Sequence, residues 1–403
     1  MGLLSWARTK LSLTDASKWT RTFALGTWAG KPVNATNALE LSTWWRAVKL
    51  YAEVTGAMPL KFYERMADGS RRPANDHPVA EILAIDPNED QTAQEFWGAQ
   101  AAGLCVIGNA YAEKSFVGNR LVALRPLPFE TLPARPNGEL EYSFVDRGKA
   151  ETLPASKVFH TKGFGFGGDL GLSPLAFARQ TLSIALATEE SAGKTFAQGL
   201  RASGFFVGPK MDKTQRDDFR KVFIDPIVGN DASAHYGILE NGFDFKQLVI
   251  PPKDAEMLLS RRFNVEEICR YMGIPPILVG HAAEGQTMWG TGVEAIINMW
   301  LTIGLDQFLR NIERSISKRV LNAGERRRYY AEFDRDALLR ADTQARGEFY
   351  WKLVQIAAMT PNDVCDKQNF PRFDGGDVRL INSTLMPLAQ AGQPRASSVN
   401  VAP

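Results

Sequence analysis

Alternating apolar and polar residues mark the strands in the first half of the chain. The run MPLKFYE followed by DGSRR predicts a strand that turns at Asp68-Gly69 into a hairpin. Residues 104–133 alternate on both sides of Gly118-Asn119, which predicts a second hairpin. Short strands are also expected at EYSF and in TLPASKVFH. Because helical runs lie between these strands, residues 50–165 are predicted to form a mostly antiparallel sheet covered by helices, an α+β layout.

Apolar residues spaced three and four apart predict helices in the rest of the chain. Ser173-Pro174 combines an N-cap with a proline at the first helical position and opens a helix that reaches about Gly199. A long helix is expected from about Val293 to Leu321. Gly304 lies in its middle, where glycine weakens a helix and permits a bend. A strand, a helix and a short capped helix are expected after it, at 329–333, 342–358 and from 360.

Two other helices carry too many charges to be buried within a single subunit. Residues 212–227 and 254–272 have few apolar positions, so we expect them to contact neighbouring chains or water. Between them, residues 230–252 predict a compact strand-turn-strand insertion with Asn241-Gly242 at the turn. Residues 277–291 follow a proline pair, contain three glycines and show no period, which predicts a loop.

Composition and charge limit the possible functions. The chain has 403 residues, of which 44% are hydrophobic and 23% charged, enough for two or three structural units with ordinary globular cores. Its formal net charge is only +2, whereas a protein that grips DNA by neutralising phosphates carries a clear basic excess. The three cysteines lie far apart, and no run is apolar enough to predict a membrane span. Residues 1–37 show no period and are expected to be an arm that is ordered only when bound.

Motifs that would indicate catalysis are incomplete. Gly163, Gly165 and Gly168 match G-x-G-x-x-G, but a helix occupies the place of the parallel strand that a dinucleotide site requires, so a flexible surface loop is the simpler interpretation. The run Gly193-Lys194-Thr195 resembles the end of a phosphate-binding loop, yet Thr188 stands where a glycine is needed. A nucleotide-dependent enzyme built on residues 163–195 therefore remains only as an alternative.

No other pattern points to chemistry. The four histidines lack zinc-binding spacing, and no Gly-x-Ser-x-Gly motif occurs, so we expect no metal, no cofactor and no enzymatic activity. The run Arg326-Arg327-Arg328 could contact phosphate, although a charge run beside a strand is usually a solvated face.

Several stretches, in this order and spacing, resemble the portal protein family of long-tailed bacteriophages and related gene-transfer particles. They cover roughly residues 40–380. The stretches are WWRAVKLYAEVTGAMPLKFYE, DHPVAEIL with DPNEDQTAQEFW, GNAYAEK, LRPLPFETL, GLSPLAFARQTL, RRFNVEEICRYMGIPPILVG, and FDRDALLRADTQARGEFYWKLVQIAAMTPNDV with FDGGD.

The resemblance implies a portal fold with a mixed α/β wing, a helical stem, a small α/β clip, a tunnel loop before a long bent helix, and a helical crown. Carried over by position, the regions are an arm (1–37), the wing (38–210), a stem helix (211–228), the clip (229–252), a second stem helix (253–274), the tunnel loop (275–291), the long wing helix with a strand (292–337), the crown (338–375) and a flexible tail (376–403).

The same resemblance implies a non-enzymatic subunit of a dodecameric ring at one capsid vertex. Double-stranded DNA would pass through the ring without sequence specificity during packaging and ejection. The expected partners are the terminase large subunit, a head-tail adaptor, and the major capsid protein or scaffold, and the ring would nucleate capsid assembly. No membrane partner is expected. The protein would reside in the virion, and in the host cytoplasm during assembly.

The candidate functional residues fall into three groups, which are the tunnel loop, the clip interface and the helix bend. Repeated glycines would let the tunnel loop change shape while the flanking helices stay fixed. In the alternative interpretation, the tunnel loop packs against the wing, and Met288 and Trp289 are buried there as core anchors. The groups are the tunnel loop (His281, Glu284, Gln286, Thr287, Met288, Trp289), an apolar clip interface between copies (Ile238, Phe243, Phe245, Leu248) and the helix bend (Gly304).

Two positions depart from the pattern of this family. Family members often have a proline in the middle of the long helix, where this chain has Ile303-Gly304-Leu305. In the crown, members commonly show Asn-Glu-x-Arg, whereas this chain has Asn362-Asp363-Val364-Cys365. A contact made by that arginine is therefore not carried over.

Overall fold

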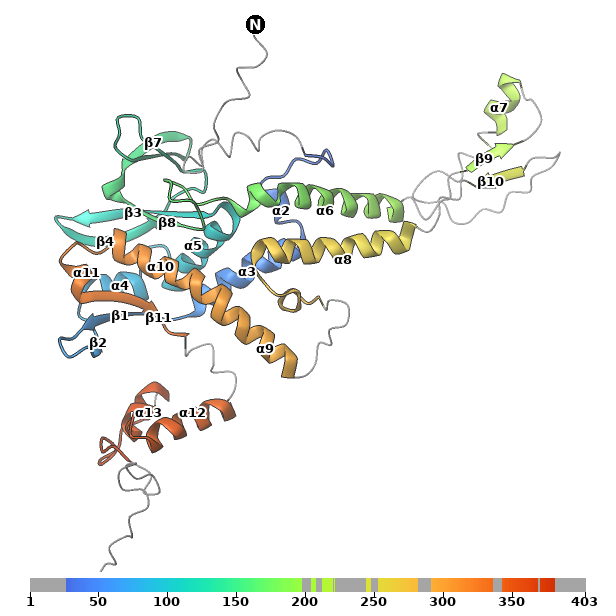
Figure 1. The fold of residues 1–403 in the computed structure, drawn as a ribbon. Coiled ribbons are helices and arrows are strands. Elements are labelled where there is room, and N and C mark those ends of the chain that lie inside the picture. Colours follow the sequence, from blue (N-terminus) through green and yellow to red (C-terminus); the bar gives the residue numbers. More distant parts are fainter. Residues whose placement is uncertain are drawn as a thin grey trace, which may run out of the picture. The chain divides into compact units, whose positions relative to one another are not determined.

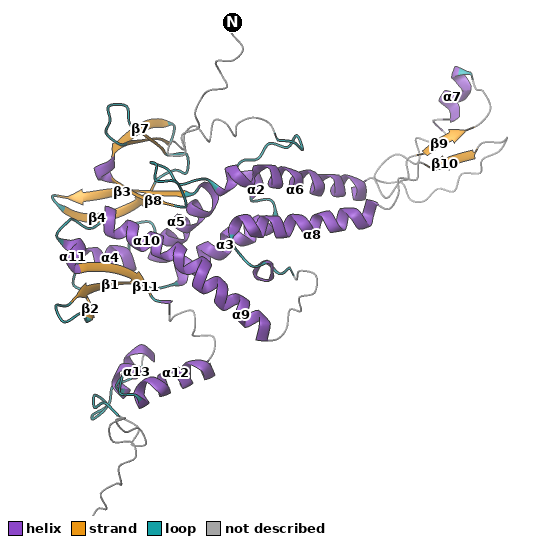
Figure 2. Cartoon of the chain, viewed as in Figure 1, coloured by secondary structure: helices purple, strands orange, loops and turns teal. Residues whose placement is uncertain are grey.

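The computed structural model describes residues 27–197, 204–207, 212–219, 221, 244–247, 253–281, 291–335, 343–368 and 370–380 (Figure 1). The chain divides after Phe333 into two compact units. The first is built of helices and short antiparallel strands, and the second of helices (Figure 2). The α+β class expected from the sequence is confirmed.

A helical pair forms the centre of the first unit. Helix α3 (Ser42–Ala57) packs along α5 (Ala93–Ile107), and Trp44 and Trp97 are almost completely buried there. Thr92 and Glu95 cap the start of α5 with reciprocal side-chain to backbone hydrogen bonds. Two short helices, α2 (Ala35–Ala38) and α4 (Pro78–Ala84), complete this region.

The predicted hairpins are present, but the single predicted sheet is wrong. Three separate three-stranded sheets form instead, because strand pairing depends on contacts between distant segments that a local pattern does not record. Their orders are β11-β1-β2, β4-β3-β8 and β5-β6-β7, with β1 (Leu60–Arg65), β2 (Arg71–Pro73), β3 (Asn109–Val117), β4 (Arg120–Pro126), β5 (Leu132–Ala134), β6 (Glu141–Asp146), β7 (Lys149–Pro154), β8 (Val158–Lys162) and β11 (Tyr329–Phe333).

Glycines with positive φ make the two predicted turns. Gly69 (φ +83°) lies between β1 and β2, and Gly118 (φ +62°) between β3 and β4. The strand β11 comes from the end of the first unit and pairs antiparallel with β1, Leu60 opposite Phe333. A short 3-10 helix, Ala155–Lys157, leads into β8.

Two long helices lie side by side in Figure 1, α6 (Pro174–Ala197) and α8 (Lys253–Met272). The end of α8 is buried through Ile268, Cys269 and Met272, so this charged helix is partly a core helix of its own subunit. The backbone amide of Trp28 donates to Gln180 of α6, and the hydroxyl of Ser183 donates to the carbonyl of Lys31. Residues 27–37 of the expected arm therefore pack on α6 without a bound partner.

The long helix predicted at 293–321 is present, but its α-helical hydrogen-bonding pattern is interrupted. It consists of α9 (Thr291–Met299), a π-helical turn (Trp300–Leu305) and α10 (Asp306–Arg319). Leu309, Ile312 and Ile316 of α10 are buried, as their spacing predicts, against β8 and β11. A one-turn helix, α11 (Glu325–Arg328), leads into β11.

The remaining elements are shorter. Strands β9 (Gly204–Val207) and β10 (Asp244–Gln247) form an antiparallel pair, and α7 covers Lys213–Phe219. The second unit contains α12 (Thr343–Gln355) and α13 (Pro361–Gln368). None of the helices described is long and apolar enough to cross a membrane.

Candidate functional site

The segment that leads into the expected tunnel loop is held against α8. It leaves α8 at Gly273 (φ +65°), forms a 3-10 turn at Pro276–Val279 and reaches Gly280 (φ +78°). The imidazole Nε2 of His281 lies 3.7 Å from the Glu266 carboxylate on α8. The start of the loop therefore lies next to the helix that precedes it.

The other five residues of the expected tunnel-loop group follow His281 in the chain. Glu284, Gln286, Thr287, Met288 and Trp289 lie outside the described residues, which resume at Thr291 with α9. Their expected role in the channel, and the alternative packing of Met288 and Trp289 as core anchors, therefore stay predictions.

Three aromatic rings join the bent helix to the rest of the first unit. Tyr51 of α3 lies edge-on to Trp300 at 5.6 Å between ring centroids and packs on Phe308 at 4.9 Å. The Tyr51 hydroxyl donates to the carbonyl of Met272 at the end of α8. Burial raises the pKa of Tyr51 to about 12, so this hydroxyl keeps its proton at neutral pH. The Tyr51 side chain of α3 thus contacts the end of α8, the first residue of the π-helical turn and the start of α10.

Gly304 lies in that π-helical turn, at a place with little free space. A Cβ added there would approach Cδ1 of Trp300 to 3.0 Å and the carbonyl oxygen of Gly273 to 3.5 Å. The sequence suggested that glycine is present for flexibility. The structure adds that it lets the bent helix approach the end of α8 and the Trp300 ring closely.

Of the expected clip, residues 229–252, the structure describes only the strand β10, and its partner β9 comes from the expected wing. Phe245 lies in β10, opposite Phe206 of β9. Ile238, Phe243 and Leu248, together with the expected partner strand before Asn241, lie outside the described residues. Sequence reasoning did not identify β9 as a partner of β10, although GFFV is a short apolar run typical of a strand.

Helix α8, the second expected stem helix, has neighbours within its own chain. The first stem helix is described only over Lys213–Phe219, and residues 212–218 are exposed. Helix α8 packs along α6 and α3 of the same chain. The apolar positions of α6 are the signal that could have indicated this pairing, because a buried stripe on one helix requires a partner.

The glycine-rich stretch at 163–171 is a close backbone packing site. The amide of Gly163 donates to the carbonyl of Gly108, and a Cβ on Gly171 would lie 2.2 Å from that same oxygen. The Gly171 amide donates to Oδ1 of Asn109. Because these two amides already have protein partners, they are not available to cradle a phosphate. At Gly163 and Gly171 the expected surface loop thus packs against the backbone of Gly108.

A buried polar chain supports the same stretch. His160 lies 3.0 Å from Asn109 through Nε2 and 3.0 Å from the Tyr142 hydroxyl through Nδ1. Asn109 donates through Nδ2 to the carbonyl of Gly171, so its Oδ1 is the atom that faces His160. Burial, reinforced by the nearby charges of Lys162 and Arg319, holds the pKa of His160 well below 6.5. This histidine is neutral and links two sheets.

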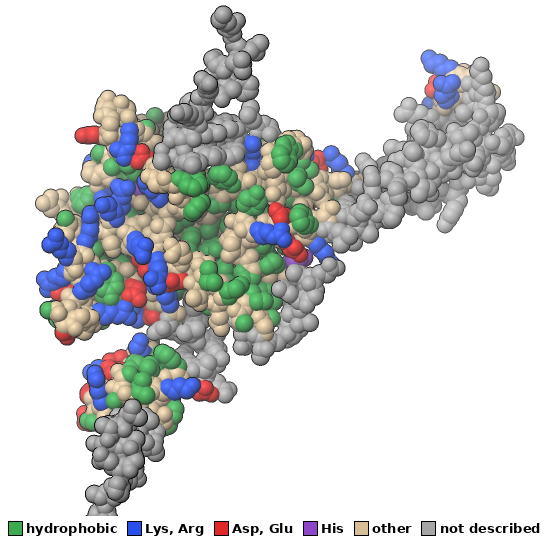
Figure 3. All heavy atoms as spheres, in the orientation of Figure 1, with side chains coloured by type: hydrophobic (Ala, Val, Ile, Leu, Met, Phe, Trp, Pro, Cys, Tyr) green, Lys and Arg blue, Asp and Glu red, His purple; other side chains and the backbone are tan. Residues whose placement is uncertain are grey.

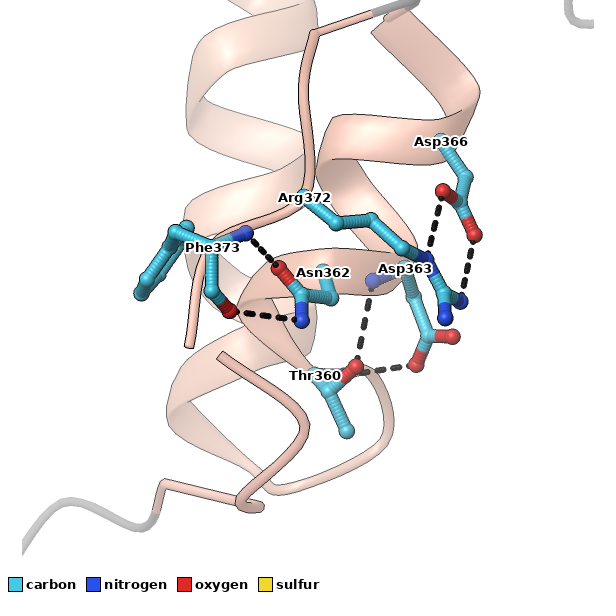
Figure 4. Close-up of polar contacts among 6 residues, drawn as sticks. All are labelled: Thr360, Asn362, Asp363, Asp366, Arg372 and Phe373. Atoms are coloured by element: carbon cyan, nitrogen blue, oxygen red, sulfur yellow. Dashed lines mark hydrogen bonds and ion pairs between the residues drawn. The ribbon is translucent and has the colours of Figure 1, made fainter. Parts of the chain in front are cut away.

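The second unit is closed by polar contacts around the start of α13 (Figure 4). The buried Asn362 side chain donates to the carbonyl of Phe373 and accepts from its amide, at 3.1 Å each. A Cβ on Gly376 would lie 2.4 Å from the Asn362 side chain, so this turn requires glycine. Asp366 accepts two hydrogen bonds from Arg372, at 2.9 and 2.8 Å. An arginine carboxylate pair is therefore present here, although Cys365 stands where family members commonly have arginine.

Part of this second unit is exposed and apolar. Phe349 and Trp351 of α12 are 54% and 65% exposed, and Phe370 after α13 is 65% exposed. Among the residues described, no group of three or more His, Cys, Asp or Glu side chains is arranged to hold a metal ion.

Comparison with known sequences gives one family over most of the chain. A family model described as "Phage portal protein" matches residues 42–369. The portal protein of Enterobacteria phage HK97 is 32% identical over 366 residues, which cover 89% of this chain and 86% of that protein. A probable portal protein of Streptomyces phage phiC31 is 25% identical and covers 81% of this chain and 73% of its own length.

Comparison with solved structures agrees on the fold. A HK97 family phage portal protein from Corynebacterium diphtheriae has a TM-score of 0.56 at 16% identity, over 78% of this chain and all of that one. A chain from the virion of a native gene transfer agent particle has a TM-score of 0.56 at 19% identity, over 89% of this chain and all of its own. A chain from the neck of that kind of particle, computed with C12 symmetry, has a TM-score of 0.50.

Proposed function

Because this chain belongs to the phage portal protein family, we propose that twelve copies of it form a ring around an axial channel at one capsid vertex. Double-stranded DNA passes through this channel during packaging and ejection. The observation that carries the proposal is the family match over residues 42–369, together with a shared fold in a neck structure that has C12 symmetry.

The surface of the subunit supports assembly into a ring. Met299 and Ile303, at and beside the π-helical turn, are 53% and 70% exposed, and Phe349 and Trp351 add apolar surface in the second unit. Exposed apolar side chains of this kind would gain free energy from burial at a contact between copies. In a ring, each subunit contacts one neighbour through one face and the other neighbour through a different face. Apolar side chains on one face can therefore be covered by a different surface of the adjacent copy.

The channel role is assigned to the tunnel loop, residues 275–291. Its beginning is held by the Glu266 contact of His281, and the bent helix is held by Tyr51. Anchored ends with glycine-containing sequence between them let the loop follow moving DNA while the helices stay in place. The near-neutral charge of +2 suits a conduit, since DNA must not adhere to it.

The ring also serves as a docking site in this proposal. The clip, residues 229–252, would contact neighbouring clips and bind the terminase large subunit during packaging and the head-tail adaptor afterwards. The wing would contact the major capsid protein or scaffold and so nucleate capsid assembly. Residence in the virion, and in the host cytoplasm before that, follows from these roles.

We assign the subunit no catalytic step. The competing nucleotide-dependent enzyme would need the 163–195 region, but the amides of Gly163 and Gly171 are bound to protein groups and Lys194 forms an ion pair with Glu190. A phosphate bound at these positions would have to displace these protein partners.

Native mass spectrometry with cryo-EM of the purified full-length chain tests the proposal. We expect closed rings whose mass is about twelve times the 44.6 kDa of the subunit. Calorimetric titration of the same sample with ATP and NAD should show no binding. A monomer or dimer that binds either nucleotide would reject the portal role in favour of the enzyme.

A further inference from the structure

One exposed sheet face of the first unit is strongly basic. Because side chains alternate along a strand, Lys61 and Arg65 of β1 and Arg71 of β2 share the face of Tyr63 and Tyr330 with one acidic residue, Glu332. Arg327 of α11 adjoins this face, since Arg65 donates to its backbone carbonyl. Figure 3 shows Lys and Arg side chains gathered at the end of the unit where these elements lie. We call this surface the basic sheet face.

Two like charges lie opposite each other at its centre. Arg65 of β1 and Arg71 of β2 are cross-strand neighbours, and both are exposed. Like charges directly opposite in a sheet are destabilising. Only Arg71 has a carboxylate in contact, that of Glu332 at 2.5 Å. The two guanidinium groups therefore place unlike demands on the face, since only that of Arg71 has its charge offset by a carboxylate.

Tyrosine rings hold both guanidinium groups in place. Arg65 lies 4.4 Å from the ring centroid of Tyr330, and Arg71 lies 4.5 Å from that of Tyr63. The two rings stack on each other at 5.6 Å. Guanidinium groups stacked on aromatic rings lose less conformational entropy when they form a bidentate contact, so this pair is prepared for an anion.

Two arginines of the face have no anionic partner among the residues that the structure describes. In the described part of the chain, neither Arg65 nor Arg327 contacts a carboxylate; Arg65 donates only to the carbonyls of Arg326 and Arg327. Arg72 and Arg328, by contrast, are both neutralised by the buried Glu64. Within the run Arg326-Arg327-Arg328, Arg328 is therefore paired with a carboxylate. Arg327 is exposed and has no such partner among the described residues.

The features of the face favour protein carboxylates over nucleic acid. The tyrosine rings are covered by arginines, so bases cannot stack on them. Glu332 and Asp68 on the same strands and turn would repel a continuous row of phosphates, and duplex binding needs many unpaired cations. Tyrosine and arginine side by side are typical of protein interfaces. Pro73 at the edge strand limits backbone pairing there, so recognition depends on side chains.

We propose that the basic sheet face binds an acidic protein segment, whose Asp or Glu carboxylates contact Arg65 and Arg327 beside the Tyr63–Tyr330 stack. The face adds a binding role to the wing that is independent of ring formation and of the DNA channel.

Fluorescence anisotropy of the full-length protein with a labelled oligoglutamate peptide, at low salt, tests this role. The double variant R65Q/R327Q should weaken binding by about fivefold or more, since two exposed ion pairs are lost. The matched control R120Q/R125Q removes two exposed arginines of β4 and should leave the affinity unchanged. Circular dichroism and native mass of each variant exclude unfolding or ring loss as the cause.

Two outcomes would overturn the proposal. One is equal weakening by both double variants, which would show nonspecific attraction. The other is tight binding of a labelled DNA duplex that R65Q/R327Q removes, with no effect on the peptide, which would identify nucleic acid as the ligand. Ring assembly is read separately by native mass, so failure here leaves the portal role untouched.

Discussion

Gly304 leaves the neighbouring Trp300 ring the space that a Cβ would take, and it lies beside the end of α8. The residues around it are fixed: Trp300 is 5% exposed and packs on Tyr51. A methyl group at position 304 would meet Cδ1 of Trp300 at 3.0 Å and find no easy displacement. A residue that the sequence marked as a flexible point is also a point of close packing.

Replacing Gly304 by alanine should therefore destabilise the protein by about 1 kcal/mol, since a packing cost of ~1–3 kcal/mol exceeds the helix-propensity gain of ~1 kcal/mol. Gly193→Ala is the matched control, because Gly193 lies in α6 with no atom near its added Cβ. That variant should gain stability. Urea unfolding measures both, and equal stabilisation by the two substitutions would contradict the packing role of Gly304.

His160 makes stability depend on pH in a defined direction. Its pKa lies well below 6.5 in the folded protein because of burial, so the unfolded chain binds a proton near pH 6 that the folded chain does not. Stability should fall as pH decreases through 6.5, by up to about 1.4 kcal/mol per pH unit from this group. His77, whose pKa is also lowered by burial, contributes in the same direction.

The variant His160→Gln should show a smaller loss of unfolding free energy on acidification than the wild type. Tyr142→Phe is the control, because it removes the hydroxyl beside Nδ1 and keeps the imidazole. Urea titrations on both sides of pH 6.5 provide the comparison. An unchanged pH dependence in His160→Gln would mean that other groups cause it.

Among the elements, the tunnel loop has its two ends held by different contacts. His281 faces Glu266 of α8 on one side, and the π-helical turn after α9 packs on Tyr51 on the other. These contacts lie outside residues 283–289, so a deletion there leaves them in place. The loop can thus be altered without removing the helices that carry it.

Deleting residues 283–289 should leave a soluble ring but reduce DNA packaging or retention in particles. Replacing the same residues by glycine and serine at equal length is the control that separates the side chains from loop length. The readouts are native mass for the ring and packaged-genome yield and length for the particle. Wild-type genome yield and length from the deletion would show that this loop does not gate the channel.

At the scale of the whole molecule, the clip at residues 229–252 is where we predict a contact between copies. Phe245 pairs with Phe206 in the two-stranded sheet β9-β10, and a sheet of two strands is marginal by itself. We therefore expect neighbouring chains to cover Phe245.

Replacing Phe245 by aspartate should impair ring formation or docking of the packaging motor and adaptor. Lys246→Asp is the control, because adjacent strand residues point to opposite faces. Size-exclusion chromatography with light scattering measures ring formation, and packaging assays measure docking. Normal rings with normal packaging in Phe245→Asp would reject the clip as an interface.

Local structure is what the sequence by itself determined about this protein. The hairpins at Gly69 and Gly118, the capped start of α6 at Ser173-Pro174 and the buried positions of α10 all follow from turn chemistry and periodicity over a few residues. The family could also be identified, because the order and spacing of many short stretches is a sequence property.

Only the tertiary structure decided which of these pieces meet. The pairing of β11 with β1, of β9 with β10 and of α6 with α8 joins segments that are distant in the chain. The same holds for the close approach at Gly304 and for the Arg65–Arg71 pair on the basic sheet face. A periodic pattern predicts that one face of an element is buried, but it does not identify the element that covers this face. The reason is that the free energy of burial depends on the apolar area removed from water and not on which partner removes it.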